Sequence, residues 1–388
     1  MSRSNLYTIY NKRIISEYLL KDAICKGFSI HTPKALSIWE MLLNCLLECF
    51  HNEFGEISIV RTLPQTTPIQ FLEDFYNDRF NRIEERIPYY TNRQGERMSV
   101  VTDALPYLFS KLGDSEVLFS TYTVVRPRTF GVKALLRDEF IRYFQFIITA
   151  DVNSREELLN KLGNAISSFF YKTRIAYVAV DRHSDSYYLK KSCMHALWLN
   201  GNIESILQCG IIKKREDSMR ANGKIVIDVG GAQRLLAMFI YNNSDSFGLF
   251  LPYSLRDYDI IIRAEHKTDI LKFYAENASS MGCRIKYVPE DLSLNKVKEI
   301  AISDSAIAIV VKRKVNEKNF ITIYNRDMTS SDLFSNEDVM EWISHKAYFL
   351  EKNLYQQQQI QIQSKIVNDN LYYKKNKYYR LIKKGIFI

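Results

Sequence analysis

The sequence predicts an α+β protein in which an antiparallel sheet core with helices is followed by a small α/β domain. Three patterns carry this prediction. Residues 203–212 and 225–228 are strand segments that we expect to pair in an antiparallel sheet. Residues 229–240 begin with small residues and continue as an apolar helix that an arginine opens. After Pro252, short apolar strands alternate with helical segments, which favours a small α/β domain with a largely parallel sheet.

Length and composition bound the class of protein. The 388 residues suggest two or three domains, and a hydrophobic share of 46% is enough for a sizeable core. No apolar run approaches the roughly 20 residues that a membrane span requires. Residues 1–6 lack the apolar core of a signal peptide. We therefore expect an intracellular protein, cytoplasmic or organellar (a mitochondrion included), with no membrane partner.

The cysteines do not indicate a metal site. None of the six forms a Cys-x-x-Cys pair. Cys45 and Cys49 lie four residues apart in an apolar helical pattern, which is typical of buried thiols. We expect reduced thiols and no bound zinc.

The positive charge is concentrated at the C-terminal end. The net charge is +9, and residues 371–388 contain six basic and no acidic residues, so the rest of the chain carries +3 (9 minus 6). Four tyrosines alternate with these charges. Phosphate neutralisation and base stacking would use such a segment, and a solvated basic extension explains it equally well.

The elements expected before Pro252 follow from apolar spacing. Pro33 suits the first turn of a helix over 34–50. The block 66–97 is charged and helical in pattern, so we expect a connecting helix there. The remaining segments are strands at 57–60, 118–125, 137–148 and 174–181 and a helix at 156–170.

The segments after Pro252 complete a division of the chain into three regions. The expected strands are 258–263, 284–288, 306–311 and 320–327, and the expected helices are 267–281, 294–303 and 336–345. The resulting domains are residues 1–254 as the core, 255–348 as the α/β domain, and 349–388 as a basic extension rich in tyrosine and lysine.

Three segments resemble the motifs of class II aminoacyl-tRNA synthetases, in the prolyl, threonyl, glycyl and histidyl branch. Residues 228–234 (Asp-Val-Gly-Gly-Ala-Gln-Arg) resemble motif 3, a Gly-x-Gly-x-x-Arg turn before a helix. Residues 27–40 resemble motif 1. Arg126 and the later Arg137-Asp138-Glu139-Phe140 run resemble the two strands of motif 2. The domain after Pro252 resembles the anticodon-binding domain of that branch.

The resemblance implies an ATP site with Mg²⁺. Arg126 would bind the α-phosphate and Arg234 the terminal phosphate, and these two are the implied catalytic residues. Arg137 and Phe140 would lie beside the nucleotide, with adenine stacked on Phe140, and Gly231 would allow the backbone to approach it. It also implies tRNA or another nucleic acid as partner, and a homodimer formed through residues 27–60.

Some of these residues have simpler explanations. Glu204 and Asp228 are candidate partners of magnesium or of a substrate amino group, or else strand acids that face solvent. Phe140 is equally well explained as a core aromatic residue.

Two departures from the motifs leave the function open. Arg128 stands where the family has an acid that accepts a hydrogen bond from adenine, and arginine has no acceptor. Val229 stands in place of the first glycine of motif 3. The chain is therefore either a synthetase that activates an amino acid and transfers it to tRNA, or a degenerate paralogue. The paralogue would act as a nucleic-acid-binding accessory or regulatory subunit, for example of the mitochondrial DNA polymerase accessory type. A generic α/β nucleotide-binding protein is the third interpretation.

Overall fold

The computed structural model describes most of the chain. The described residues are 17–19, 30–61, 63–64, 66–76, 89–100, 104–111, 117–125, 135, 140–182, 188–197, 203–212, 224–244, 247–263, 276, 283–315, 318–326, 329–333, 360 and 379–381.

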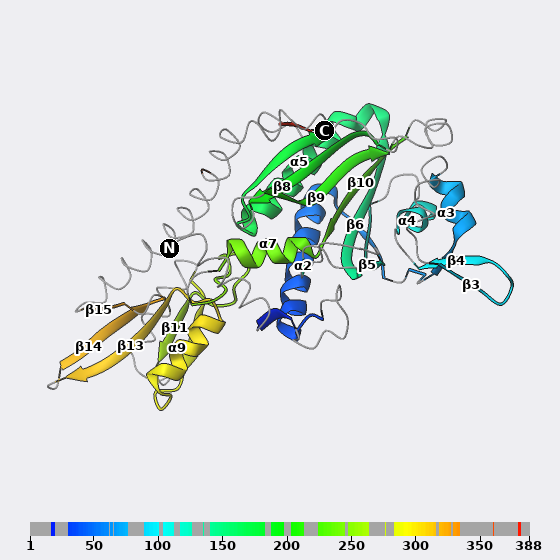
Figure 1. Ribbon diagram of the computed structural model, residues 1–388. Helices are drawn as coiled ribbons and strands as arrows, with labels where there is room; N and C mark the ends of the chain where they lie inside the picture. The colour runs from blue at the N-terminus through cyan, green and yellow to red at the C-terminus, as the bar shows by residue number, and fades with distance from the viewer. Residues whose placement is uncertain are drawn as a thin grey trace. The chain divides into compact units, whose positions relative to one another are not determined.

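The chain forms two compact units. The first comprises residues 1–171, 176–239 and 362–388, and the second comprises residues 172–175 and 240–361. Figure 1 shows most of the large sheet of the first unit in shades of green and most of the smaller sheet of the second in shades of yellow and orange. Among the described helices, none combines the length and the apolar character needed to cross a membrane.

A large mixed sheet of eight strands forms the centre of the first unit. Its spatial order is β1-β5-β6-β10-β9-β8-β7-β16. The strands are β1 (Ser58–Val60), β5 (Val117–Val125), β6 (Phe140–Asp151), β7 (Tyr177–Arg182), β8 (Tyr188–Leu197), β9 (Ile203–Ile212), β10 (Lys224–Ala232) and β16 (Tyr379–Leu381). The pair β1–β5 is parallel, and every other neighbouring pair is antiparallel. The antiparallel core that the sequence predicts is therefore present.

Helix α2 (Pro33–Phe54) packs on one face of this sheet. Thr32 begins it, since the Thr32 side chain accepts a hydrogen bond from the Ala35 backbone N–H, and Gly55 ends it with φ of 79°. Its apolar side stacks on β6, where the ring centroids of Phe50 and Phe146 lie 4.0 Å apart. The predicted helix over 34–50 is confirmed and extends further at its C-terminal end.

A second helix lies beside α2 on the same face. Helix α5 (Arg155–Lys172) follows a 3₁₀ turn at Val152–Ser154. The Cys49 thiol of α2 donates a hydrogen bond of 3.7 Å to the Ser168 hydroxyl of α5. The two helices therefore cover the face to which Phe146 points.

The opposite face of the sheet is partly covered by two short helices. Side chains alternate between faces along a strand, so Tyr143 and Gln145 of β6 point away from α2. Helices α3 (Ile69–Tyr76) and α4 (Leu105–Ser110) pack on this side, in a cluster that includes Leu72, Leu105 and Tyr188. The rest of the face carries the candidate site.

The block 66–97 differs from the predicted connecting helix. It contains β2 (Thr66–Pro68), the short α3, β3 (Tyr89–Thr91) and the start of β4 (Arg97–Val100), and these strands form a sheet in the order β2-β4-β3. The turn between β3 and β4 is fixed by Asn92, whose side-chain oxygen accepts the backbone N–H groups of Gln94 and Glu96 at 2.9 Å each. Gly95, at φ of 81°, supplies the left-handed residue of this turn.

The second unit contains a five-stranded sheet in the order β12-β11-β13-β14-β15. The strands are β11 (Ile260–Arg263), β12 (Ile285–Val288), β13 (Ala308–Val315), β14 (Lys318–Asn325) and β15 (Ser330–Leu333). Strands β12, β11 and β13 are parallel, whereas β14 and β15 add antiparallel neighbours. Helix α9 (Leu294–Ser303) has the predicted bounds, and the predicted helices at 267–281 and 336–345 lie outside the described residues apart from Glu276.

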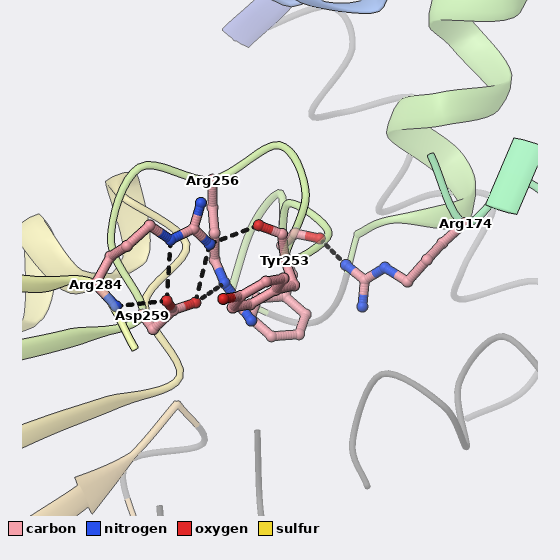
Figure 2. A network of polar contacts seen from close by, with 6 residues as sticks. Arg174, Tyr253, Arg256, Asp259 and Arg284 are labelled. Carbon is pink, nitrogen blue, oxygen red and sulfur yellow. Dashed lines mark hydrogen bonds and ion pairs between the residues drawn. The ribbon is translucent and has the colours of Figure 1, made fainter. Parts of the chain in front are cut away.

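A buried ion network holds the segment that leads into β11 (Figure 2). Asp259 is fully buried and binds the Nε atoms of Arg256 at 2.6 Å and of Arg284 at 3.0 Å. Arg284 also donates to the Tyr253 carbonyl at 2.5 Å, and Arg174 donates to the Phe250 carbonyl at 2.6 Å. Arginine side chains thus fix the backbone of residues 250–259.

Candidate functional site

A cavity of about 140 Å³ opens on the free part of the sheet face in the first unit. It lies over β9 and β10 and reaches the first residue of α7 (Arg234–Asn242). Its polar lining includes Tyr143, Gln208 and Arg234, together with the backbone around Gly230. Holding one water molecule takes roughly 10–15 Å³, so this cavity admits a ligand group of several atoms.

Arg234 supplies the positive charge of the cavity. Its Nη1 donates a hydrogen bond of 2.9 Å to the carbonyl of Ser205 on β9, which orients the guanidinium. Because Arg234 is also the first residue of α7, the charge coincides with the positive end of a helix dipole. Anions bind well at such a position.

The turn before α7 is held in place by Gln233. Its backbone N–H donates to the carbonyl of Arg142 at 2.8 Å, and its side-chain oxygen accepts the N–H of Arg142 at 3.1 Å. Gln233 is buried, with 2% of its surface exposed. The start of α7 is therefore tied to β6 rather than left as a loose loop.

The neighbouring histidine is neutral in the folded protein. Burial, together with the charge of Arg234, lowers the pKa of His195 to about 4. At neutral pH His195 therefore adds no second positive charge beside Arg234.

The two glycines of the predicted motif 3 have close side-chain neighbours. Strand β10 continues through both, pairing Gly230 with Gln145 and Gly231 with Phe144. A Cβ atom on Gly230 would lie 2.5 Å from the Tyr143 hydroxyl, and one on Gly231 would lie 2.5 Å from the Phe144 ring. The absence of side chains at these positions lets Tyr143 and Phe144 lie flat on opposite faces of β10.

Asp228 lies two residues before Gly230 and is engaged within the protein. Its Oδ1 accepts a hydrogen bond of 2.8 Å from the Gln145 side-chain amide, and its Oδ2 accepts one from the Tyr188 hydroxyl. Only 3% of its surface is exposed. Tyr122 extends the network, since its hydroxyl donates to the Gln145 oxygen at 2.8 Å.

The residues singled out from the sequence fall into three groups. Gly231 and Arg234 line the cavity, and Asp228 lies next to it. Phe140 is the first residue of β6 and is 41% exposed, and Glu204 lies on β9 opposite Ala196, with its side chain outside the description. Arg126, Arg137 and Arg128 lie outside the described residues.

The residues fit the two implied ligands differently. An ATP phosphate suits Arg234 and the start of α7. Magnesium prefers carboxylate oxygens, and Asp228 already has both oxygens engaged by Gln145 and Tyr188. Over the described part of the chain, no three His, Cys, Asp or Glu side chains come together in a group suited to a metal. As it lies in this structure, Asp228 therefore does not fit a magnesium ion.

The sequence did not single out Tyr143, Gln145, Tyr188 or Gln208. A usable signal exists for Gln208, because it interrupts the apolar end of the strand, residues 206–212. Tyr188 could not be found in this way, because its partner Asp228 is 40 residues away and the two meet only when β8, β9 and β10 pair.

No protein-family model matches the chain, and no curated protein sequence matches it significantly.

Solved structures do match. One is Giardia lamblia prolyl-tRNA synthetase in complex with prolyl-adenylate, with a TM-score of 0.67 and 14% identity over 93% of this chain and 82% of that one. Another is Cryptosporidium parvum prolyl-tRNA synthetase with halofuginone and AMPPNP, with a TM-score of 0.66 and 13% identity over 92% of this chain and 80% of that one. A structure of the Cryptosporidium enzyme with L-proline and AMP gives 0.64 at 13% identity, with the same coverage. On this structural likeness, the chain has the fold of the class II prolyl-tRNA synthetases.

Proposed function

We propose that the protein binds ATP in the cavity over β9 and β10, with a phosphate at Arg234. The observation that carries this proposal is the guanidinium of Arg234, oriented by the Ser205 carbonyl at the first residue of α7. Charge-assisted hydrogen bonds from arginine and the helix dipole both favour a phosphate there. Gly231 belongs to the same site because it lines the cavity. Two solved structures with this fold contain AMPPNP or AMP.

The remaining contacts are proposed from the resemblance alone. Arg126 and Arg137 supply further positive charge to the nucleotide, and Phe140 offers its exposed ring to adenine. Glu204 of β9 is proposed as a further residue of the nucleotide site. Substituting each by alanine and measuring ATP affinity tests these roles one at a time.

We further propose that the nucleotide serves an accessory or regulatory role and not amino-acid activation. Arg128 and Val229 replace residues that the synthetases use around adenine. Asp228, the acid nearest the cavity on β10, is engaged by Gln145 and Tyr188. Amino-acid activation followed by transfer to tRNA is the second candidate, and the structure with prolyl-adenylate favours it.

An assay of amino-acid-dependent exchange between ATP and pyrophosphate separates the two candidates. The full chain is assayed with magnesium and each of the twenty amino acids. The accessory role predicts no exchange with any amino acid, from a protein that still binds ATP. Exchange with a single amino acid would establish the enzyme and name its substrate.

Two partners complete the proposal. Nucleic acid, tRNA included, suits the net charge of +9, and its binding should weaken steeply as salt rises.

A second copy of the chain would pack against residues 27–60, where Ile30 and Ile59 are 40% and 50% exposed. A clean monomer mass in solution at micromolar concentration would exclude the dimer.

A further inference from the structure

The sheet face beside the cavity is already occupied by a side chain of the protein. The cavity lies over Gln208 and Gly230, which are cross-strand partners on β9 and β10. One step further along the same face, the next partners are Gly210 and Asp228. A group attached to a phosphate in the cavity and extended over the sheet in this direction would meet these two residues.

Tyr188 fills this position. Its ring lies so close over Gly210 that a Cβ atom there would overlap it. Lys191 of the same strand places its Nζ 4.5 Å from the centroid of that ring. Only 5% of the Tyr188 surface is exposed. The ring is therefore held between the backbone of β9 and a buried lysine.

Polar groups around the ring are matched within the protein. The Tyr188 hydroxyl donates to Asp228, whose other oxygen accepts the amide of Gln145 at 2.8 Å. A ligand group that displaced Tyr188 would have to replace this hydrogen bond, because a buried carboxylate oxygen left without a partner is strongly unfavourable.

Apolar side chains from two short helices also pack in this area. Leu72 of α3 and Leu105 of α4 belong to one buried cluster with Tyr188. Both leucines are at most 2% exposed. The area beside the cavity is thus part of the core.

We infer that Tyr188 is a specificity-determining residue that restricts the cavity to a nucleoside phosphate and excludes a nucleotide with an aminoacyl group on its phosphate. This inference rests on the proposed nucleotide binding. It also gives a physical reason for that binding to occur without amino-acid activation, because the second substrate would have to occupy the space of the Tyr188 ring.

The test compares AMP with prolyl- and alanyl-sulfamoyl-adenosine, which are stable mimics of aminoacyl-adenylates, by calorimetric titration into the full chain. The wild type should bind AMP, and it should bind both mimics at least about tenfold more weakly than AMP. Tyr188→Ala should bring the mimics to or above the affinity of AMP, while AMP affinity changes by less than about threefold. Tyr188→Phe keeps the ring and should retain the wild-type preference.

The outcomes are distinguishable. If the wild type binds either mimic more tightly than AMP, the inference is overturned while nucleotide binding stands. If ATP binds but neither AMP nor a mimic does, the inference is overturned while the proposed function stands. If ATP does not bind either, the proposed function fails and the inference fails with it. The wild-type comparison decides the matter even if Tyr188→Ala does not fold.

Discussion

At the scale of single residues, Arg234 carries the proposed phosphate contact. Arg234→Ala removes the guanidinium, and we expect ATP affinity to fall by about ten- to a hundredfold, because a hydrogen bond to a charged group contributes roughly 1.5–3 kcal/mol. Arg155→Ala, at an exposed position at the start of α5, is the matched control and should bind ATP like the wild type. Unchanged ATP affinity in Arg234→Ala would remove Arg234 from the site.

Two histidines of the first unit, the buried His31 and the half-buried His195, make its stability depend on pH. Burial lowers the pKa of His31 and of His195 to about 4, with smaller contributions from the charges of Arg142 and Arg234, respectively. The ordinary value is 6.5, so folding favours the neutral form. The stabilisation is complete above pH 6.5 and is lost progressively as the pH falls toward 4.

Urea denaturation at two pH values measures this effect. Between pH 7 and pH 5 we expect each histidine to remove about 2 kcal/mol from the free energy of unfolding. The His31→Gln variant has no group at position 31 that gains a proton in this range. Its free energy of unfolding should therefore fall by about 2 kcal/mol less than that of the wild type between pH 7 and pH 5. Equal losses in the two proteins would mean that His31 titrates normally in the fold.

At the scale of elements, local patterns predicted most of the regular structure. The strand at 203–212 and the helix at 294–303 are confirmed with their predicted bounds. Their signals are local: apolar spacing in both, and at the start of the helix the Ser293 side chain, which accepts a hydrogen bond from the Lys296 backbone N–H. Strand β8 and strand β16, near the C-terminal end, were not predicted. For β16 the reason is that it forms by pairing with β7, which is distant in sequence. The hairpin of β3 and β4 was missed because Asn92 and Gly95 lie inside a charged block that resembles a helix.

The residues of the candidate site also differ in whether a local sequence pattern predicts them. Arg234 and Gly231 were predicted from a short motif, and both line the cavity. Tyr188 and Gln145 were not predicted, because their hydrogen bonds to Asp228 join strands 40 and 83 residues apart in the sequence.

The glycines of β10 give an element-level prediction for stability. A Cβ on Gly231 would meet the Ile206 carbonyl at 2.9 Å as well as the Phe144 ring, whereas the three atoms nearest to a Cβ on Gly230 all belong to the Tyr143 side chain. A backbone carbonyl yields less readily than a side chain, so Gly231→Ala should cost about 1–3 kcal/mol and Gly230→Ala less. Denaturant titration of both variants compares them, and a smaller cost at Gly231 would contradict the described packing.

In the second unit, the ion pair between Asp259 and Arg256 gives a further prediction for stability. Asp259→Asn leaves the buried Arg256 without its charged partner, and removal of one member of a buried pair costs about 3–5 kcal/mol. Glu299→Gln breaks the exposed pair with Lys296 and should cost less than about 1 kcal/mol. Hydrogen exchange on the full chain should localise the larger effect to β11 and β12. Equal protection of these strands in both variants would show that the network does not stabilise the unit.

At the scale of the whole molecule, fold and function are separate conclusions. The likeness to prolyl-tRNA synthetases at 13–14% identity establishes the architecture. It does not carry the activity, because the chemistry depends on individual side chains. In this chain Arg234, the residue proposed to bind a phosphate, lines the cavity, and the adjoining sheet face is filled by Tyr188 and Asp228. This combination is what we expect of a synthetase scaffold used to bind a nucleotide.

The most direct test is a calorimetric titration of ATP into the 388-residue chain. We predict saturable binding of one ATP per chain, with the same stoichiometry when amino acids are present. The absence of binding heat up to millimolar ATP, together with no rise in thermal unfolding temperature, would contradict the central claim that this cavity is a nucleotide site.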